Sequence, residues 1–435
     1  MKSTYSEMKK RSVEWIGEIP EQWETKYLFQ IVSQVKCKNI NGQETNLLSL
    51  SYGKIKRKNI ETTEGLLPAS FEGYNIVEPG DIVLRLTDLQ NDHTSLRVGK
   101  VRERGIITSA YVTLRPFQGE SQYLYYALHA YDLKKGFYGM GAGVRQGLTF
   151  TEARMIEIPF PAMEIQLAIA DYLDEKCGVI DEIIEQAKAT IEEYKAWKSS
   201  VIFEAVTKGL DPNAEMKDSG VEWIGKMPET WELKPFRYFL HERTEKNSPV
   251  KSTERLSLSI ELGVTLYSEK TTNLDRFKDD FKQYKLAHEG DLVMNSMNMI
   301  VGASGVSKYF GCVSPAYYTF YDKLPDHASA KYCEYVFRSK AMLRILYSLG
   351  RGIYAIERGD DRVNTCRLKV PKEDLKALLL PSPAIKEQRK IVNYLDRKCS
   401  AIDEIIAEKE ALIADMDAYK KSLIFETVTG KRKVC

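Results

Sequence analysis

The sequence predicts a mixed α/β (α+β) protein with two globular domains separated by an antiparallel two-helix coiled coil, and with pseudo-two-fold symmetry. Three observations give this prediction. A segment of twelve residues and a segment of 44 residues each occur twice in the 435-residue chain. Both 44-residue segments have a helical pattern of apolar residues. The stretches between these repeats differ in sequence but contain a similar order of predicted strands and helices.

The shorter repeat opens each half of the chain. Val-Glu-Trp-Ile-Gly-Glu-Ile-Pro-Glu-Gln-Trp-Glu begins at Val13, and the segment that begins at Val221 matches it at nine of twelve positions. The longer repeat aligns residues 164–207 with 386–429 without a gap, at 22 identical positions of 44. Two units this long are too few and too large for a solenoid. The duplication predicts domains at 1–163 and 211–385, and spacer helices at 164–210 and 386–435.

The longer repeat has the features of a coiled-coil helix. Residues 164–207 lack proline, while Pro159 and Pro161 precede them and Gly209 follows. A heptad placed on both copies predicts a seam of mostly apolar residues. Its apolar members include Ile169, Leu173, Ile180, Ile183, Tyr194, Trp197, Ile391, Leu395, Ile402, Ile405, Met416 and Tyr419. A helix of 44 residues is roughly 65 Å long, so its simplest partner is the other copy. The alternative is two separate helices, each packed on its own domain.

The two variable stretches predict mixed domains of the same order. In the first we expect strands near 46–51, 81–86, 98–102 and 106–115, a helix near 120–134 and a glycine-rich loop at 139–147. In the second we expect strands near 255–262, 291–296, 303–309 and 313–321 and a helix near 327–348. Gly-Asp-Ile-Val at Gly80 and Gly-Asp-Leu-Val at Gly290 are a further echo between the two.

Charge is distributed unevenly, although the total is only +2. Residues 164–210 carry ten acidic and five basic side chains, so this helix would repel phosphates and is better suited to docking a protein. Two basic clusters lie in the first domain: Lys54, Lys56, Arg57 and Lys58, and Arg97, Lys100, Arg102 and Arg104. Basic loops with nearby tyrosines fit contact with DNA. The alternative for each of these residues is a solvated surface loop.

Motifs for catalysis are missing from the sequence. There is no Walker phosphate loop, no His-Glu-x-x-His and no Asn/Asp-Pro-Pro-aromatic segment. Glu215-Met216-Lys217 has the letters of a nuclease motif, but it recurs as Glu7-Met8-Lys9 and we interpret it as a connector. The seven cysteines form no Cys-x-x-Cys pair, which argues against a zinc site. No run of 18 apolar residues and no signal peptide occur, so we expect a cytoplasmic protein.

Together these segments resemble the specificity (S, HsdS) subunits of type I restriction-modification systems. The resemblance rests on the duplicated opener, the Gly-Asp-Ile/Leu-Val segments, Arg-Gln-Gly-Leu-Thr-Phe at Arg145 and Tyr-Leu-Asp-x-Lys-Cys-x-x-Ile-Asp in both predicted helices. The second half has Arg367-Leu368-Lys369-Val370-Pro371-Lys372 where the first has Arg-Gln-Gly-Leu-Thr-Phe.

The resemblance implies a non-catalytic DNA-recognition subunit. Each variable domain would be a target-recognition domain that reads one half of an asymmetric, bipartite site on double-stranded DNA. The helices would set the spacing and dock two modification (methyltransferase) subunits, with restriction subunits joining the complex. The chain itself would need no cofactor, whereas the modification subunits would use S-adenosylmethionine and the restriction subunits ATP and Mg. The rival hypotheses are a coiled-coil adaptor that binds proteins instead of DNA, and a stand-alone methyltransferase.

Specific residues can be assigned to these roles by their chemistry. Arginine pairs bidentately with guanine, and asparagine and glutamine pair with adenine. As base readers we predict Arg85, Arg145 and Gln146 in the first domain, and Asn295, Asn298 and Arg351 in the second. As phosphate contacts we predict Lys54, Lys56, Arg57, Arg102 and Lys308.

Overall fold

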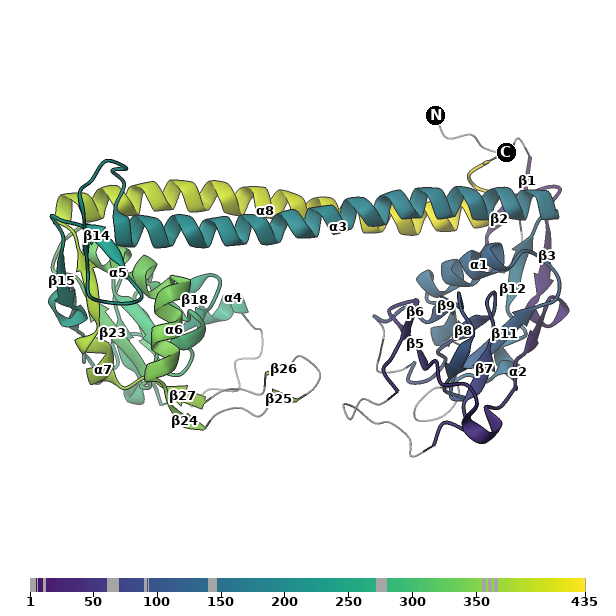
Figure 1. The fold of residues 1–435 in the computed structure, drawn as a ribbon, viewed down its shortest axis with the longest axis horizontal. Coiled ribbons are helices and arrows are strands. Elements are labelled where there is room, and N and C mark those ends of the chain that lie inside the picture. Colours follow the sequence, from purple (N-terminus) through teal and green to yellow (C-terminus); the bar gives the residue numbers. More distant parts are fainter. Residues whose placement is uncertain are drawn as a thin grey trace. The chain divides into compact units, whose positions relative to one another are not determined.

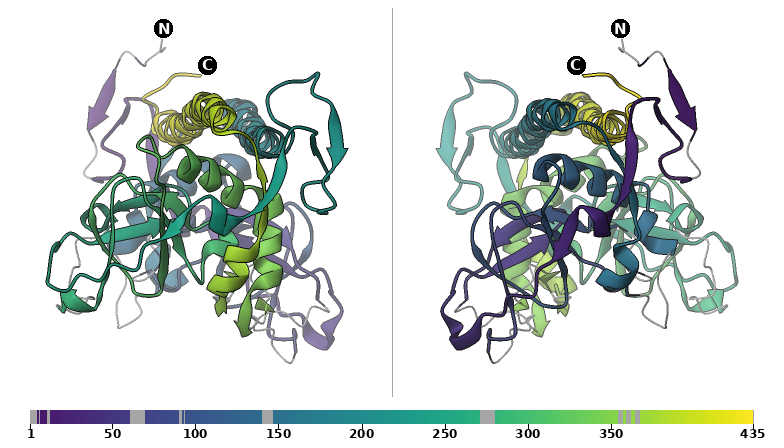
Figure 2. Two further views of the ribbon diagram at one scale, coloured as in Figure 1. Left: turned by 90° about the vertical axis from the view of Figure 1, so that its left-hand side faces the viewer. Right: turned by 90° about the vertical axis from the view of Figure 1, so that its right-hand side faces the viewer.

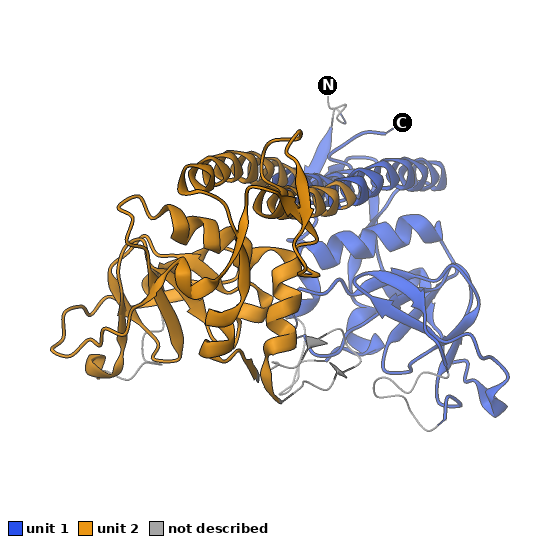
Figure 3. Cartoon of the chain, turned by 60° about the vertical axis from the view of Figure 1, so that its left-hand side comes forward, with its two compact units in different colours: residues 1–188, 410–435 blue, residues 189–409 orange. Residues whose placement is uncertain are grey.

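The computed structural model divides into two compact units (Figure 3): residues 1–188 with 410–435, and residues 189–409. Each long helix therefore contributes to both units. The structure describes residues 5, 7–10, 13–60, 70–89, 92, 94–139, 147–270, 280–353, 357–358, 362–363 and 367–434. Mixed helices and strands in both units confirm the predicted fold class.

The first unit is built on a four-stranded antiparallel sheet. Its strand order is β4 (Val32–Gln34), β11 (Val112–Pro116), β8 (Ile82–Leu84) and β9 (Val98–Lys100). Paired two-stranded ribbons surround it: β1 (Met8–Lys10) with β2 (Glu18–Pro20), β3 (Glu24–Tyr27) with β12 (Glu157–Phe160), β5 (Leu48–Ser51) with β6 (Lys54–Arg57), and β7 (Asn75–Val77) with β10 (Gly105–Ile107). The helical segments are η1 (Leu28–Gln30), η2 (Ile40–Gly42), α1 (Ser121–Leu133), η3 (Gly136–Gly139), α2 (Phe150–Ala153), and parts of α3 (Met163–Lys208) and α8 (Ile385–Val428).

The second unit repeats this order. Its sheet runs β16 (His241–Glu242), β23 (Tyr317–Tyr321), β20 (Leu292–Asn295) and β21 (Ser304–Val306). The ribbons are β13 (Met216–Asp218) with β14 (Lys226–Pro228), β15 (Glu232–Pro235) with β28 (Leu379–Ser382), β17 (Leu256–Ser259) with β18 (Gly263–Leu266), β19 (Lys285–Ala287) with β22 (Gly311–Val313), β24 (Arg351–Ile353) with β27 (Arg367–Lys369), and β25 (Glu357–Arg358) with β26 (Arg362–Val363).

The helices of the second unit differ from the prediction at one point. They are η4 (Phe236–Tyr238), α4 (Tyr267–Lys270), η5 (Phe281–Gln283), η6 (Met299–Val301), α5 (Ala328–Arg338), α6 (Lys340–Leu349) and α7 (Lys372–Ala377), together with the remaining parts of α3 and α8. The single helix predicted at 327–348 is two helices. Ser339 has extended backbone angles and its side chain accepts a hydrogen bond from the N–H of Met342, so it ends α5 and caps α6.

Within each unit, α3 and α8 lie side by side and antiparallel (Figures 1 and 2). In the first unit, Lys420 of α8 forms an ion pair with Asp181 of α3 at 2.6 Å. In the second unit, Lys198 of α3 pairs with Asp403 of α8 at the same distance. The repeat alignment makes Asp181 equivalent to Asp403 and Lys198 equivalent to Lys420. One pair of repeat positions therefore joins the helices in both units.

The buried stripe of the helices differs in part from the predicted seam. Ile169, Leu173, Ile180, Ile391, Leu395 and Ile402 are at most 5 % exposed. Tyr194, Ile405 and Met416 are half-buried. Ile183, Trp197 and Tyr419 are a correction, because 37 %, 46 % and 46 % of their surfaces remain exposed.

The error in the seam is one of register. The heptad assigned Lys176, Ile183 and Thr190 to the seam. The helix instead buries the residue after each of them, namely Cys177, Ile184 and Ile191. Ile183 and Ile184 are adjacent and equally apolar, so the pattern alone could not decide which of them faces inward. Trp197 lies at the margin of the stripe, where Lys398 Nζ is 5.7 Å from the centre of its ring.

Each globular part is fastened to its long helix by an equivalent tyrosine. Tyr126 of α1 donates a hydrogen bond to Asp174 of α3 at 2.6 Å, and Tyr335 of α5 donates to Asp396 of α8 at 2.6 Å. Both aspartates belong to the repeated Tyr-Leu-Asp segment. The repeat in the helices thus has a partner in the domains, although the domain sequences have diverged.

The duplicated opener packs on a helix end. Gly430 follows α8 with φ +71°, and a Cβ there would lie 2.3 Å from Cδ of Pro20. Gly209 follows α3 with φ +77°, and a Cβ there would lie 3.1 Å from Trp231. Both glycines are required by conformation as well as by space. This contact explains why the opener and the helix were retained together.

Candidate nucleic-acid interface

The end of the central sheet places one candidate reader at the same position in both units. β8 and β20 each run into a loop. Arg85 is the first residue after β8, Asn295 is the last residue of β20, and each is still held by the neighbouring strand. The N–H of Arg85 donates to the carbonyl of Arg97 at 2.9 Å, and the N–H of Asn295 donates to the carbonyl of Ala303 at 3.0 Å. Arg85 and Asn295 are therefore structural equivalents with different side chains.

A second segment meets this loop in both units. Leu148 donates its N–H to the carbonyl of Leu86 at 2.9 Å, and Val370 donates to the carbonyl of Ser296 at 2.9 Å. The pairing makes Leu148 equivalent to Val370. In sequence, this equivalence aligns Arg367-Leu368-Lys369-Val370 of the second half with Arg-Gln-Gly-Leu of the first. Arg145 and Gln146, two of the predicted base readers, lie outside the described residues.

Arg85 is close to a carboxylate without being hydrogen-bonded to it. Its guanidinium lies 3.7 Å from an Oδ of Asp92, and 31 % of its side chain is exposed. A nitrogen–oxygen separation of 3.7 Å is too long for a hydrogen bond. The side chain can therefore exchange Asp92 for another acceptor at low cost.

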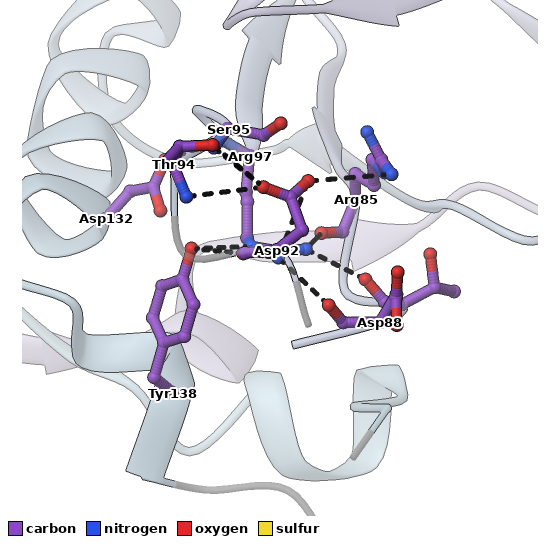
Figure 4. A network of polar contacts seen from close by, with 9 residues as sticks. Arg85, Asp88, Asp92, Thr94, Ser95, Arg97, Asp132 and Tyr138 are labelled. Atoms are coloured by element: carbon purple, nitrogen blue, oxygen red, sulfur yellow. Dashed lines mark hydrogen bonds and ion pairs between the residues drawn. The ribbon is translucent and has the colours of Figure 1, made fainter. Parts of the chain in front are cut away.

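Arg97 is a correction to the second basic cluster predicted from the sequence. Its side chain is fully buried, and all five of its guanidinium N–H groups have acceptors within the first unit (Figure 4). It cannot contact a phosphate. An arginine in a basic stretch could not be recognised as buried from the sequence, because its acceptors are mostly backbone carbonyls.

The predicted readers of the second unit have different environments. Asn295 is 7 % exposed, and its carboxamide oxygen accepts N–H groups of Met297 and Asn298, so it closes a turn. This placement argues against a direct base contact by Asn295. Asn298 is exposed in the same loop. Arg351 of β24 is 74 % exposed but is paired with Asp374 at 2.7 Å.

The predicted phosphate contacts are all exposed. Lys54, Lys56 and Arg57 lie on β6, next to a hairpin turn where Tyr52 is 76 % exposed and has φ +47°. A non-glycine residue with positive φ is uncommon and marks this turn for attention. Among the described residues, Lys54 and Lys56 have no ion-pair partner, whereas Arg57 is bound through two nitrogens to Glu103.

The remaining two predicted phosphate contacts lie in loops. Arg102 follows β9, and Lys308 lies between β21 and β22. Neither has a carboxylate within 4 Å in the part of the chain that the structure describes. The four residues Lys54, Lys56, Arg102 and Lys308 therefore keep their charge available, and Arg57 is the weakest of the five candidates.

The Gly-Asp segments of the two halves have a structural explanation. Asp81 is buried, receives two hydrogen bonds from the guanidinium of Arg115 and accepts the N–H of Glu78. Asp291 is held in the same way by Arg243. Each carboxylate is saturated by a backbone N–H of its own turn and by an arginine from another strand or its end. They stabilise the start of β8 and β20 and are not free for chemistry.

The sequence of the chain was compared with known protein families and with curated proteins. No family model matches the chain. A curated relative, the putative type I restriction enzyme MjaX specificity subunit of Methanocaldococcus jannaschii, is 22 % identical over 441 residues that cover 96 % of each chain.

This chain is similar, over nearly its whole length, to a type I restriction enzyme specificity subunit.

One solved structure agrees with this chain in fold. A chain from a study of complex assembly and conformational transition of the type I R-M system has a TM-score of 0.64 and 13 % identity, covering 94 % of this chain and 98 % of that one. The HsdS subunit from Thermoanaerobacter tengcongensis, at 13 % identity, covers 95 % of this chain and 98 % of its own with a TM-score of 0.49.

One cluster of charged residues in the second unit was missed by the sequence analysis. In the second unit, Glu242 accepts hydrogen bonds from Lys372 at 2.7 Å and Lys376 at 2.6 Å. Lys285 lies close enough for Lys369 and Lys372 to help lower its pKa, although burial is the larger cause. Lys369, Lys372 and Lys376 are close in sequence, on β27 and α7, whereas Lys285 of β19 and Glu242 come from distant segments, so the sequence did not show that they lie together. Their excess positive charge suits a polyanion.

Neither a metal-binding cluster nor a membrane-spanning helix is found among the described residues. The described residues contain no group of three or more metal-ligating side chains. No helix in the described part of the chain is long and apolar enough to cross a membrane.

Proposed function

We propose that this chain is the DNA sequence-recognition subunit of a type I restriction-modification complex. The observation that carries the proposal is the pair of equivalent sheet ends. The same frame presents Arg85 in one unit, and in the other a turn that is closed by the buried Asn295 and leaves Asn298 exposed. A duplicated frame with unlike side chains at its loops is what reading two different half-sites requires.

The two units have separate tasks in this proposal. Each reads one half of an asymmetric, bipartite site on double-stranded DNA. Arg85, Arg145 and Gln146 are the base readers in the first unit, and Asn298 and Arg351 in the second. Lys54, Lys56, Arg102, Lys308 and the lysines around Glu242 hold phosphates, which fix the register of a protein on DNA without reading sequence.

The long helices set the spacing of the half-sites and dock the methyltransferase subunits. The acidic composition of residues 164–210 supports docking to protein over contact with DNA. Val179, Ile183 and Trp197 are exposed apolar side chains on α3, with 48 %, 37 % and 46 % of their surfaces accessible. Methyl transfer and DNA cleavage then belong to the partner subunits, and this chain contributes no catalytic group.

Mapping of methylated bases tests the proposal. The gene would be expressed with its modification partner in a host that lacks DNA methylation, and the methylated positions would be read across the genome. We expect one interrupted sequence with two unlike halves. Exchange of residues 1–163 for the same region of a relative should change one half only. A contiguous or palindromic site, or no methylation, would overturn the proposal.

A bandshift with the assembled complex separates DNA recognition from the adaptor hypothesis. DNA reading predicts preference for the mapped sequence over random DNA, and binding that weakens steeply as salt rises. An adaptor for proteins would show neither the preference nor the steep salt dependence.

A further inference from the structure

The buried guanidinium of Arg97 holds the loop that carries Arg85. Removing a charge from water is costly unless hydrogen bonds replace those to solvent. Arg97 meets this condition by donating to the carbonyls of Arg85, Thr87, Asp88 and Asp92. The fifth donor, Nε, bonds the hydroxyl of Tyr138 at 3.0 Å.

Neighbouring groups fix Arg97 itself. Its N–H donates to Oδ2 of Asp132 on α1 at 2.6 Å, and its guanidinium carbon lies 5.1 Å from the centre of the Tyr138 ring. Tyr138 in turn donates to the carbonyl of Asp92 at 3.1 Å. The side chain of Arg97 therefore joins the carbonyls of residues 85, 87, 88 and 92 after β8, beside the backbone bonds of Arg85 and Leu86 (Figure 4).

Asp92 connects this support to the candidate reader. Its carboxylate accepts the N–H groups of Ser95 at 2.9 Å and Thr94 at 3.3 Å. It lies 4.0 Å from Arg97 and 3.7 Å from Arg85 (Figure 4). Burial opposes ionisation of Asp92, but the bonds from Ser95 and Thr94 and the charge of Arg97 outweigh it and lower its pKa to about 2. The carboxylate is thus charged and fixed, whereas its contact with Arg85 is loose.

The second unit lacks this arrangement. Ala303 stands where the first unit has Arg97, and the loop closes through its own backbone, with Ala303 donating to the carbonyl of Asn298 at 3.1 Å. The arginine support therefore belongs to the first reading head alone and is no general requirement of the fold.

We propose that Arg97 and Asp92 are specificity-positioning residues for Arg85. Arg97 fixes the backbone that carries Arg85. Asp92 offsets the charge of the Arg85 guanidinium until the edge of a base takes the place of Asp92 as its acceptor. An arginine neutralised in this way adds little to non-specific attraction by phosphates. It binds fully only where a guanine offers two acceptors in the right direction. The inference rests on the proposed function, since it needs DNA as the ligand.

Asp92→Asn tests the role of the carboxylate. The assembled complex would be titrated with duplexes that contain or lack the mapped site, at several salt concentrations. We expect two- to tenfold tighter binding to random DNA, a salt dependence steeper by about one phosphate contact, and a smaller ratio of specific to non-specific affinity. Adding Arg85→Ala should abolish these changes, because the released charge is then absent.

Asp326→Asn is the matched control for net charge. Asp326 pairs with Arg389 at 2.7 Å on the surface of the second unit, so its loss changes the total charge equally without touching the loop. Equal effects of Asp92→Asn and Asp326→Asn would overturn the inference. If the wild-type complex itself showed no sequence preference, the proposed function would fail instead, so the two failures are distinguishable.

Arg97→Lys tests the loop support independently. Lysine keeps the charge but has three donors in place of five, so several carbonyls of the loop lose their partner. Faster amide hydrogen exchange across residues 85–89, with at least tenfold weaker specific binding and unchanged non-specific binding, would support the role. Unchanged exchange and affinity in a folded variant would refute it.

Discussion

Asp132 of α1 accepts the backbone N–H of Arg97, so its ionisation tests the electrostatics of the support for the loop that carries Arg85. Its side chain is 1 % exposed, and its Oδ1 has no hydrogen-bond partner among the described residues. Burial raises the pKa of Asp132 from 3.8 to about 6, and Asp92 adds to the increase. The hydrogen bond and the charge of Arg97, together with Lys135, oppose it.

The sign of the resulting pH dependence follows from proton linkage. Between pH 4 and 6 the folded chain binds a proton on Asp132 that the unfolded chain has released. Stability therefore falls as pH rises through this window. A difference of about two pH units corresponds to about 3 kcal/mol. For a unit of this size that equals roughly 6–12 °C in Tm.

Asp132→Asn removes the titration and can keep the acceptor for the N–H of Arg97. Melting of the full chain would be followed from pH 4.5 to 7.5 for both proteins. We expect the Tm of the variant to rise relative to wild type as pH increases. His129→Gln is the control with the opposite sign. Burial and then Lys420 lower the pKa of His129 to about 4, so wild type loses stability toward acid. A constant Tm difference between Asp132→Asn and wild type would refute the reasoning.

Two further predictions concern the frame. Gly430→Ala should destabilise the first unit by about 2–4 kcal/mol, because the new Cβ meets Pro20 at a left-handed φ, whereas Gly178→Ala in open space on α3 should stabilise it by about 1 kcal/mol. Thermal melting of both variants measures this, and equal effects would contradict the assigned contact. Tyr126→Phe should cost about 1 kcal/mol through its bond to Asp174; a double-mutant cycle with Asp174→Asn measures the coupling, and a coupling near zero would contradict it.

Long-range order in this chain was accessible from sequence because it is repeated. The bounds of the repeat, 164–207 and 386–429, lie within one residue of the ends of α3 and α8. The spacer helices predicted at 164–210 and 386–435 are longer than α3 and α8, which end at Lys208 and Val428. The strand patterns of the two variable stretches separately predicted one order of strands, and the two four-stranded sheets are equivalent. Duplication provides two independent samples of one fold, so features shared by both are stronger signals than either alone.

The details of the candidate interface were less accessible. Arg97 and Arg102 stand in one basic run, yet the first is buried and the second exposed. Asn295 looked like a free adenine reader but its oxygen closes a turn. The lysines around Glu242 come from segments more than 80 residues apart. In each case the deciding partner is a backbone group or a distant side chain, which local patterns do not encode.

One unit is continuous in sequence and the other is not, which has a consequence for folding during synthesis. Residues 189–409 form a single uninterrupted segment, whereas the other unit needs residues 410–435. Its apolar interior includes Leu423, Ile424 and Val428 beside Ile169 and Ile180. The half that leaves the ribosome first therefore cannot complete its core until residues 410–435 have been made, and the half made later can finish folding before it. A premature stop after residue 409 would damage chiefly the amino-terminal reading head.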